Sequence, residues 1–164
     1  MIAFDHNKDI NSGTIMKNEL TIQDVADWFL AKEPMTHKKL QKLCYYAVAW
    51  GWALMNKPIA EDSEFQAWVH GPVSPNLYTK YKENGWNSLP QPKVVANITD
   101  DVAQLLESVW ITYGDKGGNE LEALSHKELP WIKARKDSSD FDLSTEPIAT
   151  DDMRSYYQSI YIER

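Results

Sequence analysis

Apolar residues recur at helical spacing through residues 36–55, and this stretch predicts the central helix of the fold. One helix face is marked by small or apolar residues: Leu40, Leu43, Cys44, Ala47, Gly51 and Leu54. From residue 43 onward the other faces are apolar too, which is typical of a helix covered on most sides. Thr36 is the predicted N-cap, and Pro58 lies just beyond the end. A helix of about 20 residues spans roughly 30 Å, close to the diameter of a small domain, so we expect the remaining elements to pack around it.

Further helices follow from the same period and from capping residues. Thr21 and Asp24 form an approximate capping box before a helix that ends ahead of Pro34. Ser74 and Pro75 suit the start of a short helix. The later predicted helices run from Thr99 or Asp100 to Gly114, over 120–126, from Pro130 to about 136, and from a cap at Thr150 through the last tyrosines.

Strand patterns are few. The stretch 64–70 alternates, with Phe65, Ala67 and Val69 on one side, and predicts a strand. Gly71 allows a sharp bend after it, and 94–98 is the second predicted strand. The fold class is therefore mainly α, α+β at most. We expect a single compact helical domain around a central buried helix, with a small two- or three-stranded β element.

Residues 1–15 show no sustained period and include the turn residues Asn11, Ser12 and Gly13. They predict a flexible N-terminal arm, followed by a domain over 16–164. A chain of 164 residues suits one domain, and no repeat or internal linker divides it.

Charge and composition narrow the functional classes. A net charge of -7 argues against non-specific nucleic-acid binding, which needs clustered Lys and Arg, and it suits a basic protein partner. The single cysteine, Cys44, excludes an internal disulfide and any multi-cysteine metal site. No stretch approaches the roughly 18 apolar residues of a membrane span or a signal-peptide core. We therefore predict a cytoplasmic protein without a membrane partner.

Residues with catalytic or metal-binding chemistry are scattered. Cys44 lies in the apolar half of the central helix and is expected to be buried, although a pair with His70 stays open. His126 and Glu128, like His6 and His37 beside other carboxylates, lack the spacing of a known ligand set. Local hydrogen bonding of His126, with Pro130-Trp131 packed on it, explains that motif. We therefore predict no catalytic, cofactor-binding or metal-binding residues.

Aromatic and basic residues leave two interpretations open. Trp68, Tyr78 and Trp86 cluster around a proline-rich turn and either pack in the core or anchor a protein interface. Lys38, Lys39 and Lys42 at the start of the central helix form either a solvated helix end or a contact for an acidic partner.

Three phrases of this chain together resemble one family. They are Leu40-Gln41-Lys42-Leu43 with Tyr45-Tyr46 and Trp50; Ala67-Trp68-Val69-His70-Gly71-Pro72-Val73 followed by Leu77-Tyr78; and Leu124-Ser125-His126-Lys127-Glu128-Leu129-Pro130-Trp131 with Ala134-Arg135. The chain from about Thr21 to its end is thereby similar to the Panacea domain of SocA-type antitoxins, which is also common in phage-associated proteins.

The resemblance implies a bacterial or phage toxin–antitoxin role, in which a folded domain binds and silences a cognate co-encoded toxin. Two alternatives accompany it: an adaptor that delivers the toxin to a AAA+ protease, and an enzyme that uses His70 or His126. The chain offers no room for an added DNA-binding region, so direct nucleic-acid binding is not expected. The motif positions, with structural or partner-binding roles, are Leu40, Lys42, Leu43, Tyr46, Trp68, His70, Gly71, Pro72, Tyr78, His126, Pro130 and Trp131.

Overall fold

A computed structural model describes residue 2 and residues 20–139 and 141–161, and over these residues the fold is mainly α, as predicted. The helices are α1 (Ile22–Lys32), α2 (His37–Met55), α3 (Pro75–Tyr81), α4 (Asp100–Tyr113), α5 (Gly118–Ser125), α6 (Leu129–Ala134) and α7 (Thr150–Ile160), with a 3-10 turn η1 (Lys82–Asn84). The strands are β1 (Met35–Thr36), β2 (Gln66–Trp68), β3 (Gly71–Val73) and β4 (Ser88–Leu89).

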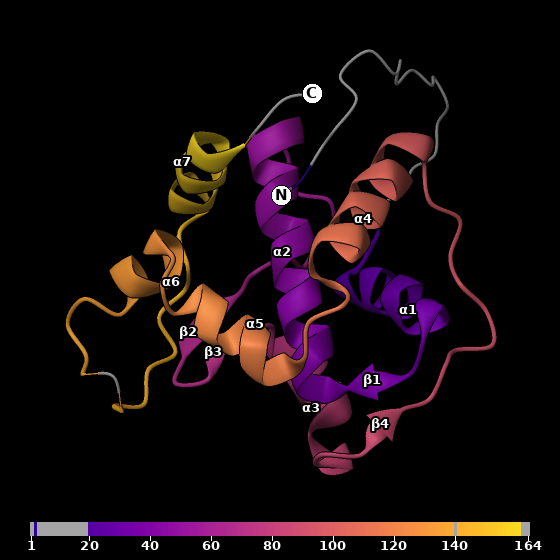
Figure 1. Cartoon of the computed structure of the whole chain (residues 1–164), viewed down its shortest axis with the longest axis horizontal. Helices are drawn as coiled ribbons and strands as arrows, with labels where there is room; N and C mark the ends of the chain where they lie inside the picture. Colours follow the sequence, from indigo (N-terminus) through magenta and orange to yellow (C-terminus); the bar gives the residue numbers. More distant parts are fainter. Residues whose placement is uncertain (1, 3–19, 140, 162–164) are drawn as a thin grey trace.

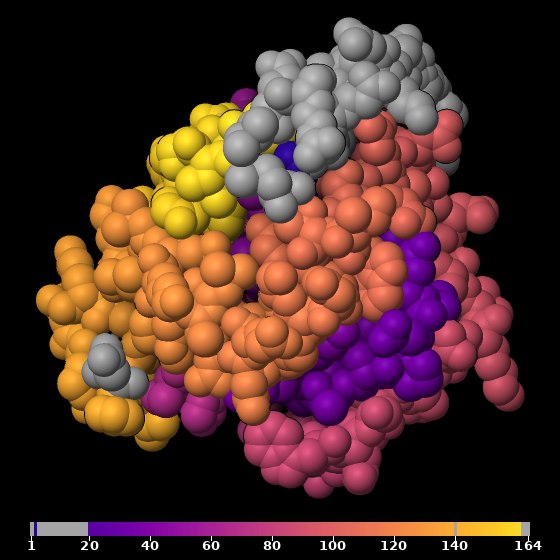
Figure 2. Space-filling model, viewed as in Figure 1, coloured from indigo at the N-terminus to yellow at the C-terminus, as the bar shows by residue number. Residues whose placement is uncertain are grey.

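The predicted central helix is α2. Helices α1, α4, α5 and α7 are arranged around it (Figure 1), and little of α2 stays visible behind α4, α5 and α7 on the face drawn in Figure 2. Every residue from Leu40 to Gly51 is buried. The Thr36 hydroxyl accepts a hydrogen bond from the backbone N–H of Lys39 and caps the helix, as expected from its residue type. The hydrophobic core of the domain is therefore formed by the side chains of α2 and those that pack around it.

Other predicted helices form where their capping residues place them. Thr21 and Asp24 make a complete capping box at the start of α1. Ser74 caps α3 through its hydroxyl. Several boundaries differ from the prediction. Thr150 is the first residue of α7 rather than its cap, and α6 ends at Ala134 rather than near 136. Helix α5 begins at Gly118, where the Glu120 carboxylate accepts from the N–H of Gly117. Helix ends of this kind are set by local hydrogen bonds that the apolar period does not report.

The β structure consists of two small antiparallel pairs in the part of the chain that the structure describes. In the first, β2 and β3 form a hairpin in which Trp68 faces Gly71; in the second, β1 pairs with β4 through Met35 and Leu89. The strand predicted over 64–70 is confirmed in its central residues. The strand predicted over 94–98 is wrong, because that segment is irregular and finds no neighbouring strand.

The predicted flexible arm, 1–15, falls outside the described residues except for Ile2. Ile2 itself is fully buried within the core cluster. The arm and its boundary at residue 16 therefore stay predictions. None of the helices in the described ranges is both long and apolar enough to cross a membrane.

The buried carboxylate of Glu128 links α2 to the segments that contain α6 and α7. The hydroxyls of Tyr46 in α2 and Tyr157 in α7 donate to the same oxygen of Glu128, at 2.8 and 2.7 Å. The Tyr45 hydroxyl lies 3.2 Å from that of Tyr157. Burial raises the pKa of Glu128, while the two tyrosine hydrogen bonds oppose that rise. Glu128 precedes α6, so this network ties α2, α6 and α7 together.

Replacing this carboxylate tests the network. Glu128→Ala removes the acceptor of two buried hydroxyls and leaves a cavity, so we expect the free energy of unfolding to fall by about 3–5 kcal/mol. Glu128→Gln keeps an acceptor oxygen and removes the buried charge, so its loss should stay below about 1.5 kcal/mol. Urea denaturation of both variants measures the difference, and equal losses would contradict a hydrogen-bonding role.

Candidate functional site

The three motif phrases meet in space around the first half of α2. The Lys42 ammonium donates to the carbonyl of Pro72 in β3 at 3.3 Å. The indole N–H of Trp131, in α6, donates to the carbonyl of Trp68 in β2 at 2.9 Å. Residues that lie 30 and 63 positions apart in the sequence are thus joined through side chains that bond to hairpin carbonyls. These two hydrogen bonds bring the three motif phrases together at the hairpin.

Gly71 is held where a side chain would fit neither the backbone nor the space. Its φ is +105°, a region that L residues rarely adopt. A Cβ at this position would lie 2.8 Å from Cε of Lys42 and 3.1 Å from Oγ of Ser125. The sharp bend predicted for Gly71 is therefore present, and α2 and α5 both press against it.

The chain after the hairpin is fixed by Gln41. Its side-chain carbonyl accepts from the N–H of Ser74 at 2.7 Å, and its amide donates to the carbonyl of Ser74 at 3.2 Å. The same amide lies 3.0 Å from the imidazole of His37. Because Ser74 caps α3, this buried amide sets where α3 begins relative to α2.

Glu122 in α5 is the electrostatic centre of the site, and the sequence analysis did not single it out. Its carboxylate forms an ion pair with Lys38 and lies 3.0 Å from Nδ1 of His70 and 4.0 Å from Nε2 of His126. Burial opposes its ionisation, but the hydrogen bonds from Lys38 and His70 lower its pKa overall. Only the three-dimensional arrangement shows this role, because Lys38 and His70 come from two distant segments, α2 and the hairpin.

The two motif histidines have different surroundings. The His70 side chain is 74 % exposed and contacts Glu122. The ring of His126 stacks on Trp131, with centroids 3.9 Å apart and planes at 17°, and burial lowers the pKa of His126. The expected packing of Trp131 on His126 is confirmed. A stacked, desolvated imidazole of this kind has a structural explanation that needs no catalysis.

The thiol of Cys44 is fully buried, and burial is the first cause that raises its pKa well above the ordinary value. A nucleophilic cysteine needs thiolate character and access, and this one has neither. His70 meanwhile pairs with Glu122, so the alternative Cys44–His70 pair has no structural support. Among the described residues, no cluster of three or more His, Cys, Asp or Glu side chains could hold a metal ion.

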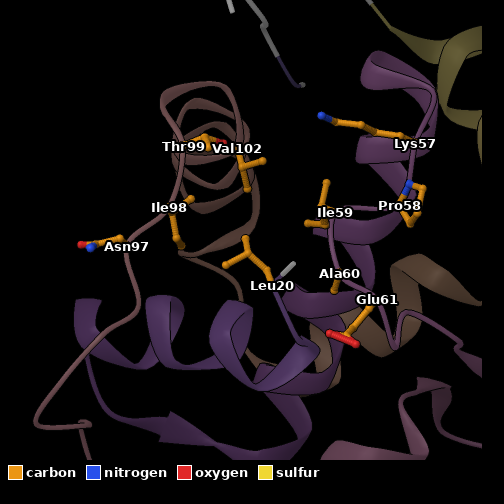
Figure 3. A pocket seen from close by; sticks show the side chains of 10 residues that line it. All are labelled: Leu20, Lys57, Pro58, Ile59, Ala60, Glu61, Asn97, Ile98, Thr99 and Val102. Carbon is orange, nitrogen blue, oxygen red and sulfur yellow. The ribbon is translucent and has the colours of Figure 1, made fainter. Parts of the chain in front are cut away.

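A surface pocket of about 570 Å³ lies away from these motifs. Figure 3 shows Leu20, Ile59, Ile98 and Val102 around it. Its titratable side chains are Lys57 and Glu61, on the loop after α2. This lining offers apolar contact but no nucleophile–base pair.

The aromatic cluster of the sequence analysis divides into buried and exposed members. Trp68 is half-buried, its indole N–H donates to Gln66, and its ring lies 4.8 Å from that of Tyr78. Tyr78 is 39 % exposed and Trp86 is 78 % exposed. The core interpretation is therefore wrong for Trp86, whereas the interface interpretation stays a prediction. Leu40, Leu43 and Tyr46, by contrast, are fully buried.

Comparison with known families identifies one match. Residues 40–132 match the family described as antitoxin SocA-like, Panacea domain. The matched range contains α2 from Leu40 onward, the hairpin, α3 and the His126–Trp131 stack, that is, all three motif phrases up to Trp131. Neither a curated protein nor a solved structure matches this chain.

Substituting two glycines tests the origin of the strain at the hairpin. Gly71→Ala should lose about 2–4 kcal/mol of unfolding free energy, from backbone strain plus the clash with Lys42 and Ser125. Gly85 is the matched control: its φ is +56°, but nothing lies within 4 Å of a Cβ there. Gly85→Ala should therefore cost only about 1–2 kcal/mol. Thermal and urea unfolding compare the two; a smaller loss at Gly71 would show that α2 does not press on the hairpin.

The buried amine of Lys42 predicts a pH dependence of stability. Burial lowers its pKa from 10.5 to about 7, an effect that Glu122 opposes and Lys38 reinforces. Between these values the unfolded chain binds a proton that the folded protein releases, so the unfolding free energy rises with pH. The expected slope reaches about 1.4 kcal/mol per pH unit, and the cost of burying the charge is fully present below pH 7.

Lys42→Met should remove this contribution and stabilise the protein most near pH 6, as measured by urea denaturation from pH 6 to 9.5. Lys80→Met, which removes an exposed lysine of α3, is the matched control for the loss of a lysine. A constant difference between wild type and Lys42→Met across this range would contradict a buried, titrating amine.

Proposed function

Because the chain belongs to the SocA-like antitoxin family with a Panacea domain, we propose that it neutralises a cognate, co-encoded toxin by binding it directly. The family match over 40–132 is the observation that carries the proposal. The proposed setting is a bacterial or phage toxin–antitoxin system in the cytoplasm, where the complex keeps the toxin inactive.

The arrangement of the site supports binding rather than catalysis. His126 is stacked on Trp131 and His70 is held by Glu122, so each imidazole already has a structural partner. A general base needs a reacting group within hydrogen-bond reach, and the nearest groups here are scaffold carboxylates and backbone. We therefore propose a binding role for this protein and no enzymatic activity.

Masking a toxin requires an interface of roughly 800 Å² on each partner, anchored by a few large side chains. Trp86 and Tyr78 are exposed aromatics of the type that anchors such interfaces. The packed hairpin and helices behind them limit the ordering cost on binding. These features suit a preformed binding surface.

Titration of the purified protein into the purified product of the neighbouring open reading frame tests the proposal. If binding masks the toxin, inhibition should saturate near an integer molar ratio, and the two proteins should co-elute in size-exclusion chromatography. Rescue of growth on co-expression is the companion measurement in cells.

Two outcomes would overturn masking. Complete inhibition at a small fraction of the toxin concentration, with no co-eluting complex, would favour an enzyme. Toxin loss that depends on a AAA+ protease would favour an adaptor.

A further inference from the structure

Exposed large apolar side chains of the described residues are concentrated in two places. Tyr78 and Trp86 lie on α3 and just after η1, close to the start of α2 in Figure 1, whereas Leu129, Ile132, Phe141 and Leu143 lie on α6 and the loop that follows it. Exposed apolar surface of this kind often marks an interaction site. The two places differ in how firmly their side chains are held.

The first place is a connected surface. Trp68 contacts Tyr78, whose ring lies 5.9 Å from that of His37. The next residue, Lys38, places its ammonium 5.9 Å from the Trp86 ring and pairs with Glu122, which in turn contacts His70. We call Trp68, His70, Tyr78, Trp86 and Lys38 the aromatic face. Trp68, His70, Tyr78 and Lys38 each contact a neighbour in the fold, whereas Trp86 stands on the turn after η1 with the Lys38 ammonium 5.9 Å from its ring.

Rigid support lowers the cost of binding at this face. The Trp68 indole donates to Gln66, its backbone carbonyl accepts from Trp131, and Gln41 fixes the start of the helix that carries Tyr78. Trp68 and Tyr78, supported in this way, lose little conformational entropy on association. In contrast, Phe141 and Leu143 stand on the irregular loop between α6 and α7, where binding would have to order them.

The charge of this face differs from that of the whole chain. The described elements that build it carry the exposed or half-buried lysines Lys38, Lys80 and Lys82. Lys39, also at the start of α2, instead donates to the carbonyl of Gly114 and lies over the Trp110 ring of α4. The elements that build the face also carry the carboxylates Glu83, Glu120 and Glu122. Lys38 and His70 bind Glu122, and Glu120 is used in the cap of α5. Outside these pairs, α3 and η1 carry Lys80 and Lys82 against Glu83, which is a small positive excess in a chain of net charge -7.

We infer that the toxin docks on the aromatic face and contributes a segment that combines acidic side chains with an apolar anchor. This inference rests on the proposed function. The apolar anchor packs on Trp86 and Tyr78, and the acidic groups meet the lysines of α3 and η1. The net charge of the chain alone would favour a basic toxin. We expect an acidic segment instead, because charge pairs within the contact surface are screened less than charges elsewhere on the chain.

A protein partner fits these charges better than a nucleic acid does. A phosphate backbone is drawn to extended Lys and Arg clusters, whereas the positive excess here is small and lies within an acidic protein. A short acidic protein segment needs only a few lysines beside an apolar contact.

Aromatic truncation is the decisive experiment, with the neighbouring gene product as the binding probe. Trp86→Ala and Tyr78→Ala should each weaken the Kd measured by calorimetry at least tenfold. Thermal unfolding monitors folding; Trp86→Ala should keep the wild-type midpoint because its side chain is mostly exposed. Ile111→Ala on α4 and Phe141→Ala on the late loop are matched controls, 77 % and 89 % exposed, and should bind within twofold of wild type.

Charge reversal tests the acidic partner. Lys80→Glu with Lys82→Glu should weaken binding at least fivefold, whereas Lys136→Glu after α6 should have little effect. Tighter binding of the Lys80/Lys82 variant would overturn the acidic chemistry.

If wild type binds the gene product and the folded Trp86→Ala and Tyr78→Ala variants bind it equally well, the inferred docking face is wrong but the proposed function stands. A tenfold loss in Phe141→Ala, with Trp86→Ala unaffected, would move the interface to the late loop and overturn the docking face as well. Tight binding of a mixed-sequence single-stranded oligonucleotide that Trp86→Ala abolishes would overturn the protein partner. Failure of wild type to bind or inhibit the gene product overturns the proposed function, and this inference with it.

Discussion

The rest of the structure depends on one constraint: α2 is buried from Leu40 to Gly51 but carries polar side chains along that length. A buried polar group without a partner costs roughly 1–3 kcal/mol, so each one requires an acceptor or donor on another element. Gln41 hydrogen-bonds with the backbone of Ser74, Lys42 donates to the carbonyl of Pro72, and the Tyr46 hydroxyl donates to Glu128. Farther along, the Trp50 indole donates to the Tyr113 hydroxyl. The polar groups of one helix thus determine how the hairpin, α4 and the α5–α6 connection are positioned.

This constraint also explains why three distant phrases form one motif. The phrase around the hairpin supplies backbone carbonyls, and the later phrase supplies the side chains that bond to them. Trp131 donates to the carbonyl of Trp68, and the guanidinium of Arg135 donates to that of Ala67 at 2.9 Å. A two-residue turn, followed at the start of β3 by Gly71 with φ +105°, allows both the helix and the indole to approach the hairpin closely. Most motif residues are therefore used in assembling the domain.

Sequence reasoning succeeded where the determinant is local. The period and caps of α1, α2 and α4 lie within a few residues, and these helices form as predicted. It failed where a partner decides the structure: the apolar run at 94–98 has no strand beside it, whereas Ser88–Leu89 pairs with β1. The role of Glu122 could not be predicted for the same reason, since its hydrogen-bonding partners Lys38 and His70 are far away in sequence. The exposure of Trp86 was equally hidden, because composition favours burying a tryptophan.

The buried and the exposed residues of the site differ in what their substitution would change. Residues such as Lys42, Gly71 and Trp131 contact two or more elements of the scaffold, so a change there alters stability before it alters recognition. Trp86 and His70 lie at the outer edge of the same network, and each has a scaffold contact at Lys38 or Glu122. Substitutions at such exposed positions usually change the free energy of unfolding by less than about 0.5 kcal/mol. Substitution of these exposed side chains would therefore leave the buried network intact.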